Sequence, residues 1–210
     1  MTNDWQTFYF LESAGSTDQA IFLLHGTGGG ERDLLPFVER FRESHHLVSL
    51  LGNVREGQMA RFFARFADGS FDRESLEAEL SQLAKFVSGW HEQAGLDPTK
   101  TVYVGYSNGA NFLLAFILAY PQLIKRVVLM HPMVPLEPSP EPDLTTQQVL
   151  VTWSRYDKMV AHQDSLKLIA KLEQWGAEVK SLKTGRGHFI DRSEVIALGE
   201  FIDQLSADSA

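Results

Sequence analysis

The chemistry that the sequence offers centres on one serine. Ser107 stands between two glycines in the run Gly105-Tyr106-Ser107-Asn108-Gly109. The β-branched and aromatic residues at 100–104 predict a buried strand before it, and the apolar residues at 111–120 predict a helix after it. In that setting G-x-S-x-G predicts a sharp turn that raises the serine hydroxyl above the edge of the sheet. The plain alternative is a turn serine with two glycines beside it by chance, and the flanking strand and helix argue against it.

A serine hydroxyl becomes a useful nucleophile when a base takes its proton and an acid orients that base. On a parallel sheet these partners are expected in loops after later strands, in the order serine, acid, histidine. Asp157 follows the expected strand at 148–153, and His188 follows the expected strand at 177–183. We therefore predict that Ser107, Asp157 and His188 form a catalytic triad.

Other titratable residues have weaker claims to these roles. Asp164 is the weaker acid because it falls inside the next expected helix. His25 and His131 end expected strands and are interpreted as braces for neighbouring loops, and His162 is placed at a helix start. His188 could be an ordinary loop histidine, but two nearby glycines and its place in the chain favour catalysis.

Acyl transfer places negative charge on the former carbonyl oxygen, which N–H donors must stabilise. The predicted donors are the backbone N–H groups of Asn108 and of Thr27, which lies in the glycine-rich turn after the strand at 20–25. That turn has a rival interpretation as a dinucleotide-binding loop. Against it, Glu31 takes the place of the final glycine of G-x-G-x-x-G, and the next strand ends at Asn53 with no acid for a ribose.

Short apolar strands alternate with amphipathic helices along the chain. This pattern predicts an α/β fold: a single domain over residues 1–210, with a mostly parallel central sheet flanked by helices and no lid domain. Strands are expected at 7–11, 20–25, 46–51, 101–106, 126–130, 148–153 and 177–183, and helices at 73–94, 163–175 and 195–205.

Composition narrows the classes of partner. The formal net charge of -8 over 210 residues argues against nucleic acid or an anionic membrane as the main partner. The chain has no cysteine, so disulfides and thiolate metal sites are excluded, and no metal or cofactor is expected. The first residues lack a signal-peptide pattern, which makes the cytosol the expected location. The oligomeric state stays open, with a homodimer among the options.

Taken together, the His-Gly-Thr-Gly-Gly turn, the Ser107 elbow, Asp157 and His188 resemble an α/β-hydrolase. The chain is similar to the small lidless phospholipase/carboxylesterase family, which also contains acyl-protein thioesterases, and within it to bacterial carboxylesterases associated with hydroquinone and quinone stress. The narrower likeness rests on residues 52–63, 105–111 and 131–135 within a resemblance that spans about residues 20–200. One departure is Lys158-Met159-Val160, where such proteins usually carry a proline-containing turn after the acid.

The segment at 52–71 is expected to shape the substrate pocket. Four apolar residues in it have helical spacing and predict one stripe of a short helix: Met59, Phe62, Phe63 and Phe66. Arg61 and Arg65 are expected on the solvated side of that helix. The stripe is either plain core packing or the wall of an acyl or aryl pocket, for which Met133 is a further candidate.

The residues and the resemblance together imply a serine hydrolase that cleaves small carboxylic esters or thioesters through an acyl-enzyme intermediate. Two alternatives stay open. One is a catalytically retired hydrolase that binds a small ligand, and the other is a lysophospholipase or acyl-protein thioesterase. The missing lid and the acidic surface disfavour a lipid–water interface.

Overall fold

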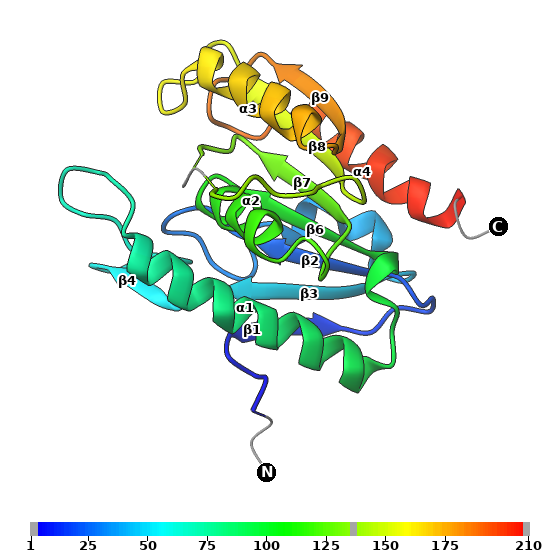
Figure 1. Cartoon of the computed structure of the whole chain (residues 1–210). Coiled ribbons are helices and arrows are strands. Elements are labelled where there is room, and N and C mark those ends of the chain that lie inside the picture. Colours follow the sequence, from blue (N-terminus) through cyan, green and yellow to red (C-terminus); the bar gives the residue numbers. More distant parts are fainter. Residues whose placement is uncertain (1–3, 135–137, 208–210) are drawn as a thin grey trace.

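The computed structural model describes residues 4–134 and 138–207, and its strands form one seven-stranded sheet with a separate hairpin (Figure 1). The sheet strands are β1 Tyr9–Ser13, β2 Ala20–Leu24, β3 His46–Leu51, β6 Thr101–Tyr106, β7 Arg126–Met130, β8 Gln148–Ser154 and β9 Glu178–Thr184. Their order is β1-β3-β2-β6-β7-β8-β9. Only the β1–β3 pair of this sheet is antiparallel. The predicted mostly parallel α/β sheet is therefore confirmed.

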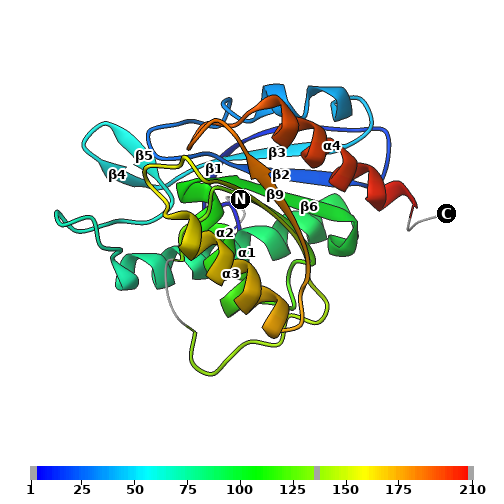
Figure 2. The ribbon, with the colours of Figure 1, turned by 90° about the horizontal axis from the view of Figure 1, so that it is seen from above.

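Helices cover both faces of the sheet (Figures 1 and 2). On one face lie α1 Arg73–Ala94, α2 Asn108–Ala119 and α3 His162–Gln174. On the other lie α4 Arg192–Ala207 and the 3-10 turns η1 Leu35–Phe37 and η2 Glu39–Phe41. A third 3-10 turn, η3 Pro98–Lys100, leads into β6. Within the described residues, none of the helices combines the length and apolarity needed to cross a bilayer.

The central strands are apolar because both of their faces are covered. Every residue of β2 is buried. Its side chains alternate, so that Phe22 and Leu24 pack under α1 and α2 while Ile21 and Leu23 pack under α4. The core therefore has two layers, and the loops at the carboxyl ends of the parallel strands gather at one edge.

Two sequence-based expectations need correction. The first strand begins two residues later than expected, at Tyr9. The short helix expected around 59–66 is wrong, because this segment begins with strand β5 Met59–Arg61, which forms a hairpin with β4 Val54–Glu56. Gly57, with a φ of 62°, makes the tight turn that joins the two strands. This turn overrides the helical spacing of the four apolar residues.

Candidate active site

Ser107 occupies a sharp turn between β6 and α2, with a φ of 51°. The glycines on either side make this turn sterically feasible. A Cβ on Gly105 would lie 2.5 Å from Gly109 O, and a Cβ on Gly109 would lie 2.2 Å from Leu24 O. Because backbone atoms cannot give way at such distances, the strand and the helix meet only if both residues are glycine. The positive φ of the serine is the strain expected of a nucleophile elbow.

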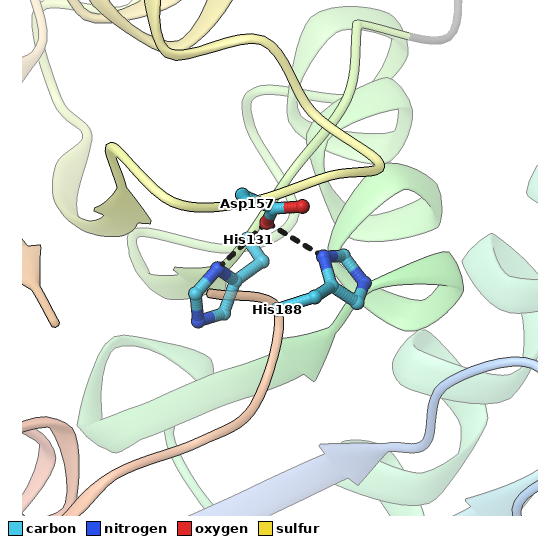
Figure 3. Close-up of side chains that lie close together, drawn as sticks. All are labelled: His131, Asp157 and His188. Carbon is cyan, nitrogen blue, oxygen red and sulfur yellow. Dashed lines mark hydrogen bonds and ion pairs between the residues drawn. The ribbon is translucent and has the colours of Figure 1, made fainter. Parts of the chain in front are cut away.

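Loops after β6, β8 and β9 bring the three predicted triad residues together. His188 Nε2 lies 2.9 Å from Ser107 Oγ, and His188 Nδ1 lies 2.7 Å from Asp157 Oδ2, the second contact being drawn in Figure 3. Both are hydrogen-bond distances. The imidazole therefore lies between hydroxyl and carboxylate, the arrangement in which it can take the serine proton while the acid fixes its tautomer.

Asp157 is a buried carboxylate with a full set of donors. Its Oδ1 accepts the backbone N–H groups of Met159 and Val160 at 2.8 and 3.0 Å. Burial raises the pKa of Asp157, but the hydrogen bonds from His188 and from these two N–H groups outweigh it, so the pKa lies below its ordinary value. The Lys158-Met159-Val160 turn, where a proline-containing turn was expected, thus holds the acid through its backbone.

The loop that carries His188 is tied to the serine strand. Tyr106 donates its hydroxyl proton to His188 O at 2.6 Å. On the other side of the histidine, Gly187 has a φ of 69° and donates its N–H to Ser154 Oγ at 3.2 Å. Burial raises the pKa of Tyr106, and the negative charges of Glu194 and Asp157 raise it further. The phenol therefore stays protonated as a donor.

The predicted oxyanion donors are available to a ligand. Thr27 follows β2, and Asn108 is the first residue of α2. Among the described residues, neither backbone N–H is engaged in a hydrogen bond. The turn 26–30 leads into η1 and η2 rather than into an α-helix, so it lacks the helix N-terminus that binds pyrophosphate in a dinucleotide site. The structure therefore gives the dinucleotide interpretation no support.

The hairpin β4–β5 braces both of these donors. Three consecutive residues make the contacts: Ala60 O accepts the Gly28 N–H at 2.9 Å, Arg61 Nη1 donates to Thr27 Oγ1 at 2.8 Å, and the Phe62 N–H donates to Asn108 Oδ1 at 2.8 Å. The hairpin is therefore part of the machinery that fixes the turn after β2 against the start of α2.

Comparison with known proteins identifies the family. MhqD of Bacillus subtilis strain 168, which is named as a hydrolase, is 33% identical over 180 residues that cover 86% of this chain and 90% of MhqD. The chain belongs to the phospholipase/carboxylesterase family of α/β-hydrolases. It is a hydrolase of the carboxylesterase type.

Solved structures agree with this assignment. The carboxylesterase of Bacillus cereus is 33% identical and superimposes with a TM-score of 0.89, covering 95% of each chain. A carboxylesterase of Mesorhizobium loti is 27% identical, with a TM-score of 0.82 over 89% of this chain and 88% of the other. No family model matches the sequence.

The predicted pocket residues of this hydrolase divide into two groups. Phe62 and Phe63 are fully buried, and the ring of Phe62 stacks on Phe112 at 5.3 Å, so both belong to the core rather than to a cleft wall. Met59 and Met133, by contrast, are 41% and 37% exposed. Their place in the pocket stays a prediction.

Two clefts flank the triad. One, of about 430 Å³, lies between the turn that carries Thr27, the residue Tyr106 before the nucleophile and the residue Phe189 after the histidine. The other, of about 330 Å³, is lined by Met133 and Met159. The first cleft includes the residues directly before Ser107 and directly after His188, and the second includes Met159 and Val160, whose N–H groups hold Asp157.

Arg61 was expected on a solvated surface, and this expectation is wrong. Its side chain is only 3% exposed. Besides Thr27 it contacts Phe63 O through Nε at 3.1 Å and lies 3.4 Å from Glu56. Arg65, which hydrogen-bonds the same carboxylate, is 35% exposed. The two arginines therefore share one carboxylate but differ in burial, which a helical projection could not show.

The remaining titratable candidates have local roles. His25 lies with Nδ1 2.6 Å from Gly26 O and accepts the Gly52 N–H at 3.0 Å, so it braces two loops as predicted. His162 begins α3, and Asp164 lies in its first turn, 3.2 Å from Lys167. Neither is in hydrogen-bond contact with the triad.

His131 lies much closer to the chemistry than the sequence suggested. It directly follows β7, and its Nδ1 is 3.1 Å from Asp157 Oδ2, the oxygen that also binds His188 (Figure 3). Ligand atoms of these three residues lie within 4.8 Å of one another, a spacing that a metal ion could bridge. Hydrogen bonds through Asp157 Oδ2 already join them, so the cluster forms a polar network.

Proposed function

We propose that this hydrolase cleaves small carboxylic esters through a Ser-His-Asp triad and an acyl-enzyme intermediate. The observation that carries the proposal is the continuous line of hydrogen bonds from Ser107 Oγ through His188 to the buried carboxylate of Asp157. The strained turn at Ser107 and the free N–H groups of Thr27 and Asn108 support it.

In the first half of the reaction, Ser107 Oγ attacks the ester carbonyl carbon while His188 Nε2 accepts the hydroxyl proton. The carbonyl oxygen becomes an oxyanion, which the N–H groups of Thr27 and Asn108 stabilise. The tetrahedral intermediate collapses, the bond to the alcohol oxygen breaks, and the alcohol leaves with the proton that His188 returns to it. An acyl-serine remains.

In the second half, His188 takes a proton from water and the resulting hydroxide oxygen attacks the acyl carbon. The same two N–H groups stabilise the second oxyanion. Collapse breaks the bond to Ser107 Oγ, which regains its proton from His188, and the carboxylic acid is released. Asp157 stays ionised throughout, and its depressed pKa suits that role.

The clefts support a small apolar or aromatic substrate. The cleft of about 430 Å³ is lined in part by Phe37, Tyr106 and Ile190, and it has room for a group of benzoyl or short acyl size. A panel of p-nitrophenyl esters and acyl-thioesters of increasing length tests this choice. A preference for long acyl chains would favour the lysophospholipase or acyl-protein thioesterase alternative.

The substitution Ser107→Ala tests the proposal. We expect hydrolysis of p-nitrophenyl butyrate to fall at least about 10⁴-fold, with the fold unchanged, because only the nucleophilic oxygen is removed. Undiminished hydrolysis by this variant would exclude the mechanism. A wild-type protein that neither hydrolyses the esters nor reacts with a fluorophosphonate would instead indicate a retired hydrolase that binds its ligand without turnover.

A further inference from the structure

Two non-glycine residues in the described part of the chain have a positive φ: Ser107 at 51° and His131 at 52°. Each directly follows a strand, and the two strands are neighbours in which Tyr106 pairs with Met130. Strained backbone of this kind concentrates at functional sites. The nucleophile elbow explains Ser107, whereas the proposed triad gives no reason for the strain at His131.

Both ring nitrogens of His131 face a carboxylate. Nδ1 lies 3.1 Å from Asp157 Oδ2, and Nε2 lies 3.1 Å from Glu194 Oε1, with the His131 side chain fully buried. The Nε2 contact lacks the alignment of a hydrogen bond, and it is an ion pair when His131 is protonated. The other titratable groups around the ring are His188 and Tyr106, whose ring centroids lie 5.2 and 6.2 Å away.

Glu194 is a buried carboxylate that needs a counter-charge. Its side chain has no exposed surface. Oε1 accepts the Thr152 hydroxyl at 2.5 Å and Oε2 accepts the Asp191 N–H at 2.9 Å, but these donors are neutral. Among the described residues, no lysine or arginine forms an ion pair with it. Burying an uncompensated carboxylate is costly, and within the described part of the chain His131 is the ionisable group placed to compensate it.

We propose that His131 is a positioning residue that carries a proton on both ring nitrogens and joins Glu194 to the acid of the triad. Both ring nitrogens lie 3.1 Å from a carboxylate oxygen, and only the imidazolium presents an N–H to a carboxylate on each side. The positive charge of His131 balances Glu194, so that His188 faces one net negative charge although two carboxylates are buried nearby. This inference rests on the proposed function, because it concerns how the triad is held.

Loss of the His131 charge should change the pH dependence of catalysis. If the charge of His131 is removed, Asp157 and Glu194 are both uncompensated beside His188. The imidazole of His188 then keeps its proton to a higher pH, and it is available as a base over a narrower range. Replacing a residue that merely filled space would not shift the pH below which activity is lost.

The test compares kcat/KM against pH for p-nitrophenyl butyrate in three proteins. His131→Asn preserves the backbone at this position, because asparagine tolerates a positive φ. Glu194→Gln removes the charge but keeps an oxygen that can accept the Asp191 N–H at the start of α4. We expect the acid limb of the His131→Asn profile to move up by about one pH unit. In the double variant both charges are absent, and the limb returns to its wild-type position.

An acid limb that stays in place in His131→Asn overturns the proposal, as does a double variant displaced as far as the single one. If His131→Asn does not fold, ¹⁵N NMR of the histidine-labelled wild-type protein at pH 7.5 takes its place. In the wild-type spectrum we expect one imidazole with both nitrogens protonated. We expect the signal of this imidazolium to be absent from the spectrum of Glu194→Gln. A spectrum with neutral imidazoles alone overturns the proposal.

The two proposals fail separately. An inactive wild type, or full activity in Ser107→Ala, refutes the proposed function. If the wild type is active and Ser107→Ala is not, an unmoved profile refutes only the role of His131.

Discussion

The serine half of this site is positioned mainly by backbone, with one charged brace at Arg61, whereas the histidine half depends mainly on charged side chains. On the serine side, two glycines permit the turn at Ser107 and the hairpin 54–61 fixes the neighbouring N–H donors. On the histidine side, Asp157 binds two imidazoles, and the network continues to Glu194. The serine half should therefore respond to added volume, and the histidine half to charge and pH.

The largest effect is expected from breaking the charged half. Asp157→Asn leaves a neutral amide beside His188 Nδ1, which favours the wrong tautomer of the imidazole, and kcat should fall about 10⁴-fold. Steady-state kinetics with p-nitrophenyl butyrate checks this. The matched control is Asp164→Asn, the weaker acid candidate, and a loss of activity in that variant comparable to the loss in Asp157→Asn would reverse the assignment of the acid.

Adding side-chain volume tests the serine half, as removing a charge tests the histidine half. A Cβ at Gly109 would lie 2.2 Å from Leu24 O, so Gly109→Ala should lower the free energy of unfolding by at least about 3 kcal/mol. At Gly185, in the loop before the histidine, a Cβ meets no atom within 4 Å, and Gly185→Ala should change stability by less than about 0.5 kcal/mol. Urea denaturation measures both, and equal midpoints would contradict the steric account.

Lowering the pH should reduce activity and stability through two different histidines. Activity should fall at acid pH, because a protonated His188 can no longer act as a base. His91 is a buried histidine outside the site, with Nε2 2.9 Å from the Tyr103 hydroxyl. Burial lowers the pKa of His91 to about 4.

The sign of the His91 effect follows from that depressed pKa. Between pH 6.5 and about 4 the unfolded chain binds a proton at His91 that the folded chain does not, so stability falls as pH falls, by up to about 3 kcal/mol. His91→Gln should flatten the dependence of unfolding free energy on pH in this window and leave the activity profile unmoved. A shift of the activity profile in His91→Gln would mean that activity is lost through unfolding.

The smallest effect is expected at the brace of the serine half. Arg61→Met keeps most of the side-chain volume but removes the hydrogen bond to Thr27 Oγ1, and kcat should fall about tenfold because the oxyanion donor is less well fixed. Arg65→Met removes the other guanidinium at Glu56 without touching Thr27, and it should leave kcat unchanged. Equal losses of kcat in the two variants would show that the positive charge near Glu56, rather than the hydrogen bond from Arg61 to Thr27, supports catalysis.

The sequence predicts well those parts of the site that depend on order along the chain. Ser107, Asp157 and His188 each follow a strand, and parallel strands deliver such loops to one edge of the sheet, so their meeting could be anticipated. The fold class followed from the same alternation of strands and helices. The bounds of most elements lay within one or two residues of those expected.

Long-range contacts explain what the sequence could not predict. The segment at 59–66 has helical spacing, yet Gly57 turns it into a hairpin whose bonds go to residues 27, 28 and 108. His131 and Glu194 meet across the end of β7 and the first turn of α4. A local signal existed for Glu194, since Asp191 three residues before it matches a capping box, but nothing local pointed to its imidazole partner.

Trapping of the acyl-enzyme tests the central claim most directly. The wild-type protein is mixed with p-nitrophenyl acetate, quenched in acid within the first turnover and digested for mass spectrometry. The account predicts a single acetyl adduct on the peptide that contains Ser107. An adduct on another residue, or rapid hydrolysis with no covalent adduct at any time, would contradict it.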